Sequence, residues 1–322
     1  MNYRDLTKRA PIDEREALEV LNAGPSDMPA VLGAADELRR RHKGDEVNLC
    51  SIVNARSGAC PEDCAFCAQS ARHKTSADVY PMLSPDEVLD RAKQAVGFRA
   101  REFSVVTSGY KNNRARDFKG VTQAVRTVAE ETPLKVCASL GTLTDEQLSH
   151  LKAAGLTRYH HNLETARSFF PRVCTTHSYD EDYEMVRKAK EHGFYVCCGG
   201  IFGMGESPAQ RVELALTLRD LDVDSIPINF LNPIPGTPLE GASHLTPYEC
   251  LKIIAMMRLV LPEKDIVICG GREVNLRDLQ SMIFHAGANG MMVGGYLTTG
   301  GRDYNDDLKM IEDLGLKVKG RE

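Results

Sequence analysis

The sequence predicts an α/β fold, with a (β/α)8 barrel as the leading architecture and an open, doubly wound sheet as its rival. From about residue 46 onward, short apolar segments alternate with amphipathic segments of helical length. This alternation is typical of parallel strands that are joined by helical crossovers. The residues suited to chemistry lie at or just after the ends of the expected strands, and those ends converge on one face of a barrel.

Each element can be placed in order along the chain. Helical patterns over residues 12–21 and 28–42 precede the first strand. Eight strands are expected at 47–53, 102–107, 134–139, 157–163, 194–198, 225–230, 266–269 and 290–293. Helices are expected between them at 85–96, 117–130, 144–154, 180–192, 208–221, 248–259 and 276–286, several after capping residues such as Ser84 and Thr144. We therefore expect a helical extension over 1–44 and a single barrel domain over 45–322, with one more helical segment after residue 302.

Composition and charge exclude several classes of protein. The 322 residues are 42% apolar and 26% charged, as in soluble enzymes. A net charge of −5 gives no basic field for nucleic acid or an anionic membrane, and no apolar run approaches the roughly 18 residues of a membrane span. The first residues lack the apolar core of a signal peptide. Ten cysteines without an export signal therefore indicate a cytoplasmic protein with metal or redox chemistry.

Three cysteines in one predicted loop are the most informative local feature. Cys60, Cys64 and Cys67 follow the first expected strand with the spacing C-x3-C-x2-C, and Phe66 stands before the third. Three thiolates can bind three irons of a [4Fe–4S] cluster and leave the fourth iron open for a small molecule. A structural zinc site would need a fourth ligand at short spacing, and His73 fits no common zinc finger. The spacing therefore favours a cluster with an open iron.

The loop resembles the cluster-binding loop of radical S-adenosylmethionine (radical SAM) enzymes. Segment 59–71 is similar to the signature of biotin synthases, and segments 159–165, 196–206, 227–239 and 270–273 match that family in order and spacing. The resemblance covers about residues 45–317. It implies a radical SAM barrel that converts dethiobiotin to biotin, the last step of biotin biosynthesis. The two carbons that receive sulfur there are unactivated, so a cofactor must supply a radical.

The resemblance also implies cofactors and contacts. The open iron would bind SAM, whose cleavage gives a 5′-deoxyadenosyl radical, and an auxiliary iron–sulfur cluster would supply the sulfur. Asn162 and Asn229 are expected to contact dethiobiotin, because an amide offers a donor and an acceptor to its ureido ring. No side chain is expected to act as a catalytic acid or base. Contacts to SAM are expected from six residues: Ser108, Gly109, Asn162, Glu164, Ile201 and Glu206.

The auxiliary cluster is where the sequence departs from the family. In the best-known biotin synthases, three cysteines and an arginine hold a [2Fe–2S] cluster. Cys137, Cys197 and Arg272 match three of those four positions. The fourth position falls at Ser104, whose hydroxyl is a poor replacement for a soft thiolate.

Two ligand sets remain open for this cluster. In the first, which we favour, Cys137, Cys174 and Cys197 supply thiolates to a [4Fe–4S] cluster. In the second, a [2Fe–2S] cluster keeps Ser104 or Cys198 as a ligand. Adjacent residues of a strand point to opposite faces, so Cys198 is expected to face the helices when Cys197 faces the barrel interior. Three further cysteines are assigned to packing: Cys50, Cys250 and Cys269.

A second departure concerns the carboxylate of SAM. The family often carries an arginine in the helix after the fourth strand, and this sequence has Asp182 there. Two carboxylates cannot form an ion pair at neutral pH. The sequence leaves His177, Arg187 and Arg72 open as replacements.

Two other functions compete with the leading one. Another radical SAM barrel, such as a hydrogenase-maturation or methylornithine-synthase relative, would lack the combined auxiliary-site and substrate positions. A non-enzymatic iron–sulfur carrier would have no use for the SAM positions. The expected partners are dethiobiotin, SAM, an electron donor such as flavodoxin or ferredoxin, iron–sulfur assembly proteins and a second copy in a homodimer.

Overall fold

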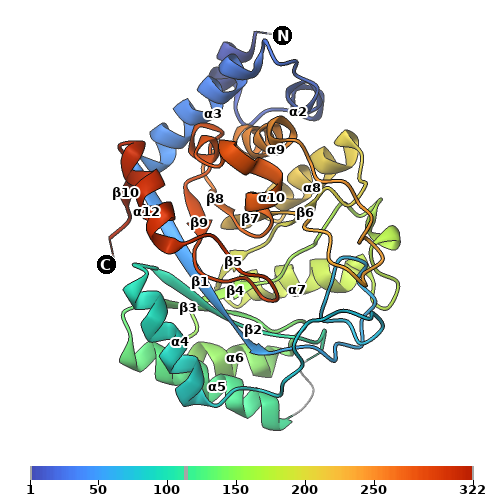
Figure 1. Cartoon of the computed structure of the whole chain (residues 1–322), viewed down its shortest axis with the longest axis vertical. Helices are drawn as coiled ribbons and strands as arrows, with labels where there is room; N and C mark the ends of the chain where they lie inside the picture. Colours follow the sequence, from blue (N-terminus) through green and yellow to red (C-terminus); the bar gives the residue numbers. More distant parts are fainter. Residues whose placement is uncertain (1, 112–114, 321–322) are drawn as a thin grey trace.

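The computed structural model describes residues 2–111 and 115–320, and its parallel strands close into a barrel with helices around it (Figure 1). The ring closes because the last barrel strand pairs with the first. The predicted eight-stranded (β/α)8 barrel is therefore confirmed, and the open sheet is excluded. In ring order the strands are β1 (Glu46–Arg56), β2 (Glu102–Thr107), β3 (Lys135–Ser139), β4 (Arg158–His160), β5 (Tyr195–Cys197) with β6 (Gly200–Phe202), β7 (Ser225–Phe230), β8 (Asp265–Ile268) and β9 (Gly290–Met292).

The fifth position of the ring is a strand in two pieces. Both β5 and β6 pair with β7 in parallel. Gly199 lies between them, and a Cβ on Gly199 would stand 2.0 Å from the carbonyl oxygen of Pro227 on β7. Only glycine permits this close approach of two backbones. The expected strand at 194–198 is thus present, and its continuation as β6 was not predicted.

Most expected helices are present with small changes at their ends. The barrel helices are α4 (Pro85–Gly97), α5 (Ala115–Glu131), α6 (Asp145–Ala153), α7 (Tyr179–Glu191), α8 (Pro208–Asp220) and α9 (Pro247–Val260). The predicted caps Ser84 and Thr144 both form capping boxes. In each, the cap hydroxyl accepts from the backbone N–H of the third helical residue, and the side chain of that residue accepts from the backbone N–H of the cap.

The helix predicted over 276–286 is wrong. The chain forms three short pieces there: α10 (Arg272–Leu276), η3 (Arg277–Leu279) and α11 (Met282–His285). Arg277 has a φ of 50°, in a region that L-residues rarely adopt, and a continuous helix cannot pass through it.

The N-terminal extension and the tail pack on the outside of the barrel. The extension comprises η1 (Tyr3–Asp5), α1 (Leu6–Arg9), α2 (Glu14–Leu21) and α3 (Met28–Lys43), and its α2 and α3 lie against α9 (Figure 1). Its buried apolar residues belong to the same core as those of the barrel, so its separation as a unit over 1–44 stays a prediction. The tail forms the expected helix, α12 (Tyr304–Asp313), and an unpredicted strand, β10 (Lys317–Val318), which pairs with the start of β1.

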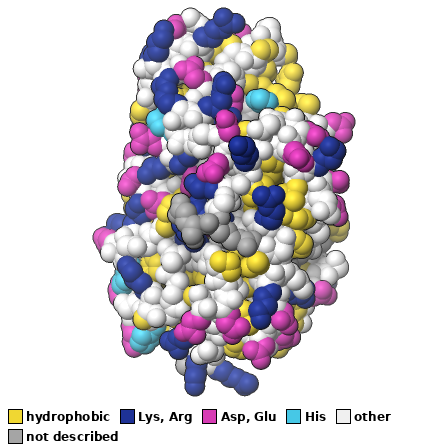
Figure 2. All heavy atoms as spheres, turned by 90° about the vertical axis from the view of Figure 1, so that its left-hand side faces the viewer, with side chains coloured by type: hydrophobic (Ala, Val, Ile, Leu, Met, Phe, Trp, Pro, Cys, Tyr) yellow, Lys and Arg dark blue, Asp and Glu magenta, His cyan; other side chains and the backbone are white. Residues whose placement is uncertain are grey.

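The surface carries both signs of charge. On the face shown in Figure 2, lysine and arginine side chains are interspersed with aspartate and glutamate, in keeping with the net charge of −5. Among the described residues, no helix is both long and apolar enough to span a bilayer.

Candidate iron–sulfur and substrate site

A cavity of about 330 Å³ lies inside the barrel. Its lining side chains come from every position of the ring, and on β2 residues 102, 104 and 106 face it while their neighbours do not. This alternation follows from the period of two along a strand. Four predicted contact residues line the cavity, together with Phe66 of the cysteine loop: Asn162, Glu164, Ile201 and Asn229. The cavity therefore connects the loop with the barrel interior.

Four cysteines line this cavity: Cys50 on β1, Cys137 on β3, Cys197 on β5 and Cys269 just after β8. A hydrogen bond with the Cys269 thiol, together with burial, raises the pKa of Cys50. A hydrogen bond with Cys137, together with burial, raises the pKa of Cys197, and the same contact lowers the pKa of Cys137. The Cys197 thiolate also raises the pKa of Cys50, so the two pairs of thiols influence each other. We call these four residues the cavity group.

The sequence missed half of the cavity group. Cys50 and Cys269, which the sequence assigned to packing, both line the cavity, whereas Cys250 on α9 lies in the apolar core as expected. The signal was present in the alternation of the strands: Cys50 is two residues before Ile52, and Cys269 is two residues after Val267, and both of those partners also line the cavity.

The neighbours of Cys137 and Cys197 lie as their strand positions predict. Cys198 is fully buried in the core outside the cavity lining, so it and Cys197 point to opposite faces. Ser104 on β2 lines the cavity, and its hydroxyl forms a hydrogen bond that lowers the pKa of Cys137 after the larger effect of Cys197.

Arg272 does not line the cavity, contrary to expectation. Its side chain is 1% exposed, and its guanidinium pairs with Asp307 of α12 at 2.6 Å. A second nitrogen donates to Gln280 Oε1 at 2.7 Å. Because Arg272 stands on α10 after the turn that ends β8, its charge joins α10 to α12 rather than to the thiols.

The three loop cysteines follow β1 on a segment that folds back on itself. The Cys60 N–H donates to the Gln69 carbonyl at 3.1 Å, and the Cys67 N–H donates to the Cys64 carbonyl at 2.9 Å. The predicted residues Ser108 and Gly109 lie against this segment. The Ser108 hydroxyl donates to the Gly58 carbonyl at 2.7 Å. A backbone hydrogen bond from Gly109 lowers the pKa of Cys60, although burial raises it overall.

Cys174 lies beside the loop cysteines and not in the cavity group. Its Sγ is 3.8 Å from Cys64 Sγ and 3.2 Å from His177 Nδ1. The hydrogen bond with Cys64, and then that with His177, lowers the pKa of Cys174 to about 4. The chain after β4 crosses the cysteine loop, where the Ala65 N–H donates to the Val173 carbonyl at 2.8 Å. This path corrects the expectation that Cys174 joins Cys137 and Cys197.

Asn162 and Glu164 are fixed at the end of β4. Asn162 Oδ1 accepts from the Gly199 N–H at 3.1 Å, and its Nδ2 donates to Glu164 Oε2 at 3.3 Å. Burial, and then the charge of Asp182, raises the pKa of Glu164 to about 8. The Glu164 carboxyl therefore lines the cavity largely in its neutral form at pH 7.

Glu206 shapes a loop instead of lining the cavity. Its carboxylate accepts from the backbone N–H groups of Gly203 and Met204 at 2.9 and 2.8 Å, and from Arg211 Nε at 2.8 Å. Its side chain is 2% exposed. These bonds hold the turn after β6, the strand that carries Ile201.

Asp182 contacts two histidines. Its Oδ1 lies 2.8 Å from His161 Nε2, and its Oδ2 lies 3.4 Å from His177 Nε2. The His177 ring stacks on Tyr110 at a centroid distance of 3.9 Å. Burial alone would lower the pKa of His177, but its bonds to Asp182, Cys174 and Glu62 raise it to about 11. The negative charge of Asp182 is thus balanced within the protein.

The other two candidates for the SAM carboxylate lie at the surface. Arg187 is half exposed and pairs with Glu184 and Glu191 along α7. Arg72 donates through Nε to the Pro61 carbonyl at 2.8 Å. His177 is the buried cation of the three, with an 8% exposed side chain.

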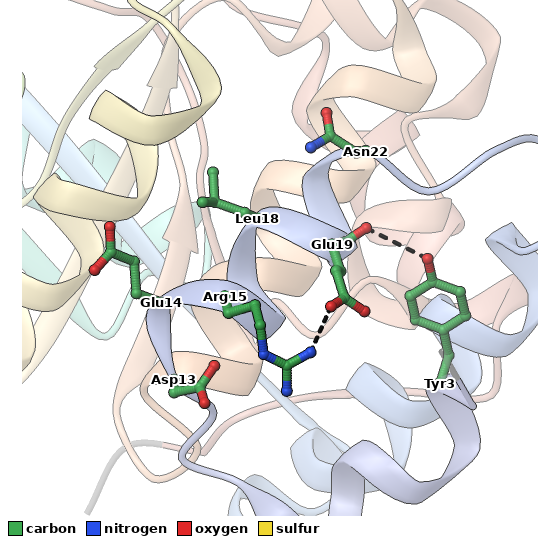
Figure 3. Close-up of a pocket in the computed structure, with 7 residues that line it drawn as sticks. All are labelled: Tyr3, Asp13, Glu14, Arg15, Leu18, Glu19 and Asn22. Atoms are coloured by element: carbon green, nitrogen blue, oxygen red, sulfur yellow. Dashed lines mark hydrogen bonds and ion pairs between the residues drawn. The ribbon is translucent and has the colours of Figure 1, made fainter.

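A second hollow, of about 800 Å³, lies on the N-terminal extension between η1 and α2 (Figure 3). Its polar groups bind one another: the Tyr3 hydroxyl donates to the Glu19 carbonyl at 3.3 Å, and Arg15 pairs with the Glu19 carboxylate at 2.6 Å. The described residues that line it include neither cysteine nor histidine. We therefore place the chemistry in the barrel cavity.

Comparisons with known proteins identify the family of the chain. Residues 55–218 match the family model of the radical SAM superfamily, and residues 227–317 match that of the Biotin and Thiamin Synthesis associated domain. The chain is 54% identical over 314 residues to the biotin synthase of Geobacter sulfurreducens, covering 98% of this chain and 95% of the relative. It is 54% identical over 307 residues to the biotin synthase of Citrifermentans bemidjiense, covering 95% and 93%.

Solved structures share the fold at lower identity. A methylornithine synthase superposes with a TM-score of 0.87 at 20% identity, covering 100% of this chain and 98% of that chain. An FeFe-hydrogenase maturase from Carboxydothermus hydrogenoformans superposes with a TM-score of 0.83 at 15% identity, covering 98% and 77%. At these identities the likeness shows a common barrel and nothing about the reaction.

Proposed function

This chain belongs to the biotin synthase family of radical SAM enzymes, and from that premise we propose that it inserts sulfur into dethiobiotin to form biotin. One observation carries the proposal. A single closed-barrel cavity is lined both by Phe66 of the cysteine loop and by four thiols from the strands. A substrate in that cavity would lie between a radical source at its mouth and a sulfur source in its wall.

The residues present fit iron–sulfur groups. Thiolates are the soft ligands that such clusters need, and the cysteine loop offers three of them on one folded segment. We propose that Cys60, Cys64 and Cys67 hold a [4Fe–4S] cluster with an open iron. When bound, this cluster and SAM supply a radical that can break an unactivated C–H bond.

We further propose that the cavity group holds the auxiliary cluster as a [4Fe–4S] species. Cys50, Cys137, Cys197 and Cys269 contribute one thiol for each of four irons, three from separate strands and one from just after β8. Ser104 offers a harder oxygen donor beside Cys137, and Arg272 is engaged with Asp307. This ligand set replaces the one expected from the sequence, which included Cys174 and Arg272.

Asn229 is prepared to bind the ureido ring of dethiobiotin. Its Nδ2 donates to the Gly200 carbonyl at 3.3 Å, and its Oδ1 accepts from the Gly270 N–H at 3.0 Å. A carboxamide has two N–H donors and two carbonyl lone pairs, so one of each is left for the cavity. A urea offers the complementary donor and acceptor.

The predicted SAM contacts divide by what they touch. Asn162, Glu164 and Ile201 line the cavity and are proposed to contact the ribose and adenine, with Asn162 also near dethiobiotin. Ser108, Gly109 and Glu206 are proposed to act beside them, the first two next to the cysteine loop and the third through the turn after β6. His177, the buried candidate for the SAM carboxylate, already pairs through its two ring nitrogens with Glu62 and Asp182.

The cellular setting is proposed from the family. It comprises a cytoplasmic homodimer, an electron donor such as flavodoxin or ferredoxin, and iron–sulfur assembly proteins that restore the auxiliary cluster. The ten cysteines, all free thiols in the described structure, support a reducing compartment.

The test of the reaction is anaerobic. Reconstituted protein is incubated with SAM, dethiobiotin and a reductant, and products are measured by mass spectrometry. We expect biotin together with 5′-deoxyadenosine, and the same products from Cys250→Ser, whose thiol lies outside both groups. Deoxyadenosine without biotin, with both clusters shown to be loaded, would exclude dethiobiotin as the substrate and keep the radical SAM assignment.

A further inference from the structure

Cys174 belongs to neither proposed cluster, yet it is held among metal-ligating atoms. Cys64 Sγ, Cys174 Sγ and a ring nitrogen of His177 all lie within 4.8 Å of one another. Cys64 Sγ and Cys174 Sγ are 3.8 Å apart, and Cys174 Sγ is 3.2 Å from His177 Nδ1. Around one tetrahedral ion with metal–sulfur bonds of about 2.3 Å, two sulfur ligands stand about 3.8 Å apart. The two sulfurs thus already have the spacing of ligands to one ion, and a ring nitrogen of His177 lies within 4.8 Å of both. We call Cys64, Cys174 and His177 the triad.

The surroundings orient His177 as a metal ligand. Its Nε2 lies 3.4 Å from Asp182 Oδ2, and a metal-binding histidine commonly donates its second ring N–H to a carboxylate. That bond leaves Nδ1 directed at Cys174. Glu62 Oε2 lies 2.8 Å from the same Nδ1, but it is not one of the ligand atoms that all lie within 4.8 Å of one another.

The segment that carries Cys174 is fixed to the cysteine loop. Asp63 accepts from the Thr175 N–H at 2.9 Å and from the Thr176 hydroxyl at 3.1 Å. Cys174 is 4% exposed, and the His177 side chain is 8% exposed. The site is therefore built from two segments that are bonded to each other, and it is shielded from water.

We propose that the cluster-free protein binds one divalent transition-metal ion through Cys64, Cys174 and His177, and that this ion and the loop cluster exclude each other. The exclusion rests on the proposed function, since it takes Cys64 as a cluster ligand. A cubane binds each cysteine at a different iron, so Cys64 cannot serve both sites at once. Zn²⁺ binds such ligands more tightly than Fe²⁺, and it therefore blocks assembly of the loop cluster.

The first test measures binding of cobalt, whose tetrahedral thiolate complexes absorb visible light. Because the cavity group offers further thiols, reduced cluster-free protein is titrated anaerobically in a background in which all four of them are replaced: Cys50→Ser, Cys137→Ser, Cys197→Ser and Cys269→Ser. We expect one Co²⁺ per chain with the absorption of a tetrahedral thiolate site. Adding Cys64→Ser or Cys174→Ser abolishes it, and adding His177→Gln weakens binding by tenfold or more. Cys60→Ser and Cys67→Ser are matched controls, because they remove loop thiols that lie outside the triad, and they keep the cobalt site.

The second test measures whether the loop cluster assembles without Cys174. In the same background, Cys174→Ser is expected to assemble the loop [4Fe–4S] cluster as well as its parent and to resist inhibition by Zn²⁺. Circular dichroism and thermal unfolding verify that the variant is folded. Cobalt binding that survives Cys174→Ser, or that disappears equally with Cys60→Ser, would overturn the mononuclear site. A folded Cys174→Ser protein that fails to load the cluster without zinc would overturn the exclusion. None of these readouts depends on biotin formation.

Discussion

The two cysteine groups of this barrel are built in different ways. Cys60, Cys64 and Cys67 come from one short segment, whose shape is set by its own backbone hydrogen bonds and by contact with the chain after β4. The cavity group comes from three strands and from just after β8, all far apart in the sequence, and its spacing is set by the register of the barrel. A loop can offer three ligands and leave a position open, whereas a closed ring of strands surrounds its contents on every side.

This difference suits two different uses of iron and sulfur. An exchangeable co-substrate needs an open position at the mouth of the barrel, which the loop would provide in the proposed assignment. A sulfur source needs a fixed position next to the substrate carbons, which the barrel wall would provide in the same assignment. Removing the cavity group should therefore leave SAM cleavage intact, whereas removing the loop group should stop both SAM cleavage and biotin formation.

The largest effect is expected from the loop group. Cys60→Ala removes a ligand of the loop cluster, so we expect it to abolish both 5′-deoxyadenosine and biotin formation. The measurement is product formation by mass spectrometry after anaerobic reconstitution. Cys250→Ser is the control, and deoxyadenosine formation at the wild-type rate by Cys60→Ala would contradict the assignment.

The cavity group should separate the two products. Cys269→Ser and Cys50→Ser each remove one proposed ligand of the auxiliary cluster and leave the loop group untouched. We expect biotin formation to be lost while SAM cleavage to 5′-deoxyadenosine continues. Both products are measured in one assay, and wild-type yields of biotin from Cys269→Ser would return that thiol to a packing role.

Arg272 is expected to be structural and not a ligand of the auxiliary cluster. Its buried pair with Asp307, with side chains 1% and 0% exposed, predicts a structural role. Arg272→Met leaves the buried Asp307 carboxylate with only the more distant Arg302, at 3.6 Å, and should lower the free energy of unfolding by about 3 kcal/mol. Urea unfolding of the cluster-free protein measures this. Folded Arg272→Met should still load the auxiliary cluster, and failure to do so would restore Arg272 as a ligand.

Substitution of Asn229 should weaken the binding of dethiobiotin. Asn229→Ala removes the one donor and one acceptor that this side chain would offer to the substrate. We expect an increase in KM for dethiobiotin of roughly 30-fold, corresponding to about 2 kcal/mol. The KM for SAM should stay unchanged, because this side chain is directed to the substrate. Equal changes in both constants would show a general distortion of the cavity.

The smallest effect is expected at the other end of the barrel, where Lys43 of α3 pairs with Asp265 of β8 at 2.8 Å. Burial alone would raise the pKa of Asp265, but Lys43, Tyr195 and Asn289 hold it at about 2. Because this pKa is depressed, the stability it contributes is present above the unfolded value near pH 3.8 and is lost as pH falls toward 2. Lys43→Met should cost about 1–2 kcal/mol at pH 6, and in urea unfolding the difference from wild type should shrink as pH falls through 2 and vanish below it. A difference that is independent of pH would assign the loss to packing.

Local patterns were enough for the barrel and for the cysteine loop. Alternating segments and capping residues such as Ser84 predicted the helices, and the spacing of Cys60, Cys64 and Cys67 identified the loop. Both depend on residues that are close in sequence. The broken helix at Arg277 was missed because its positive φ has no local signal in a residue that is not glycine.

The cavity group could be predicted only in part because it depends on which face of each strand turns inward. Side chains two residues apart on a strand point to the same face. Once Ile52 and Val267 are known to face inward, Cys50 and Cys269 are therefore expected to do so as well. Cys174 was misplaced for another reason. Its position beside the cysteine loop depends on the hydrogen bond between the Ala65 N–H and the Val173 carbonyl, which joins segments far apart in the sequence. No spacing of residues in the sequence predicts that contact.

The central claim is that the chain holds two separate cubane clusters, one in each cysteine group. The most direct test is the iron and acid-labile sulfide content, with Mössbauer spectra, of wild type and Cys269→Ser after identical anaerobic reconstitution. We predict about eight irons per chain in wild type and about four in the variant, with the signal of the loop cluster unchanged. A Cys269→Ser protein that keeps the full iron content and both spectral components of wild type would contradict the account.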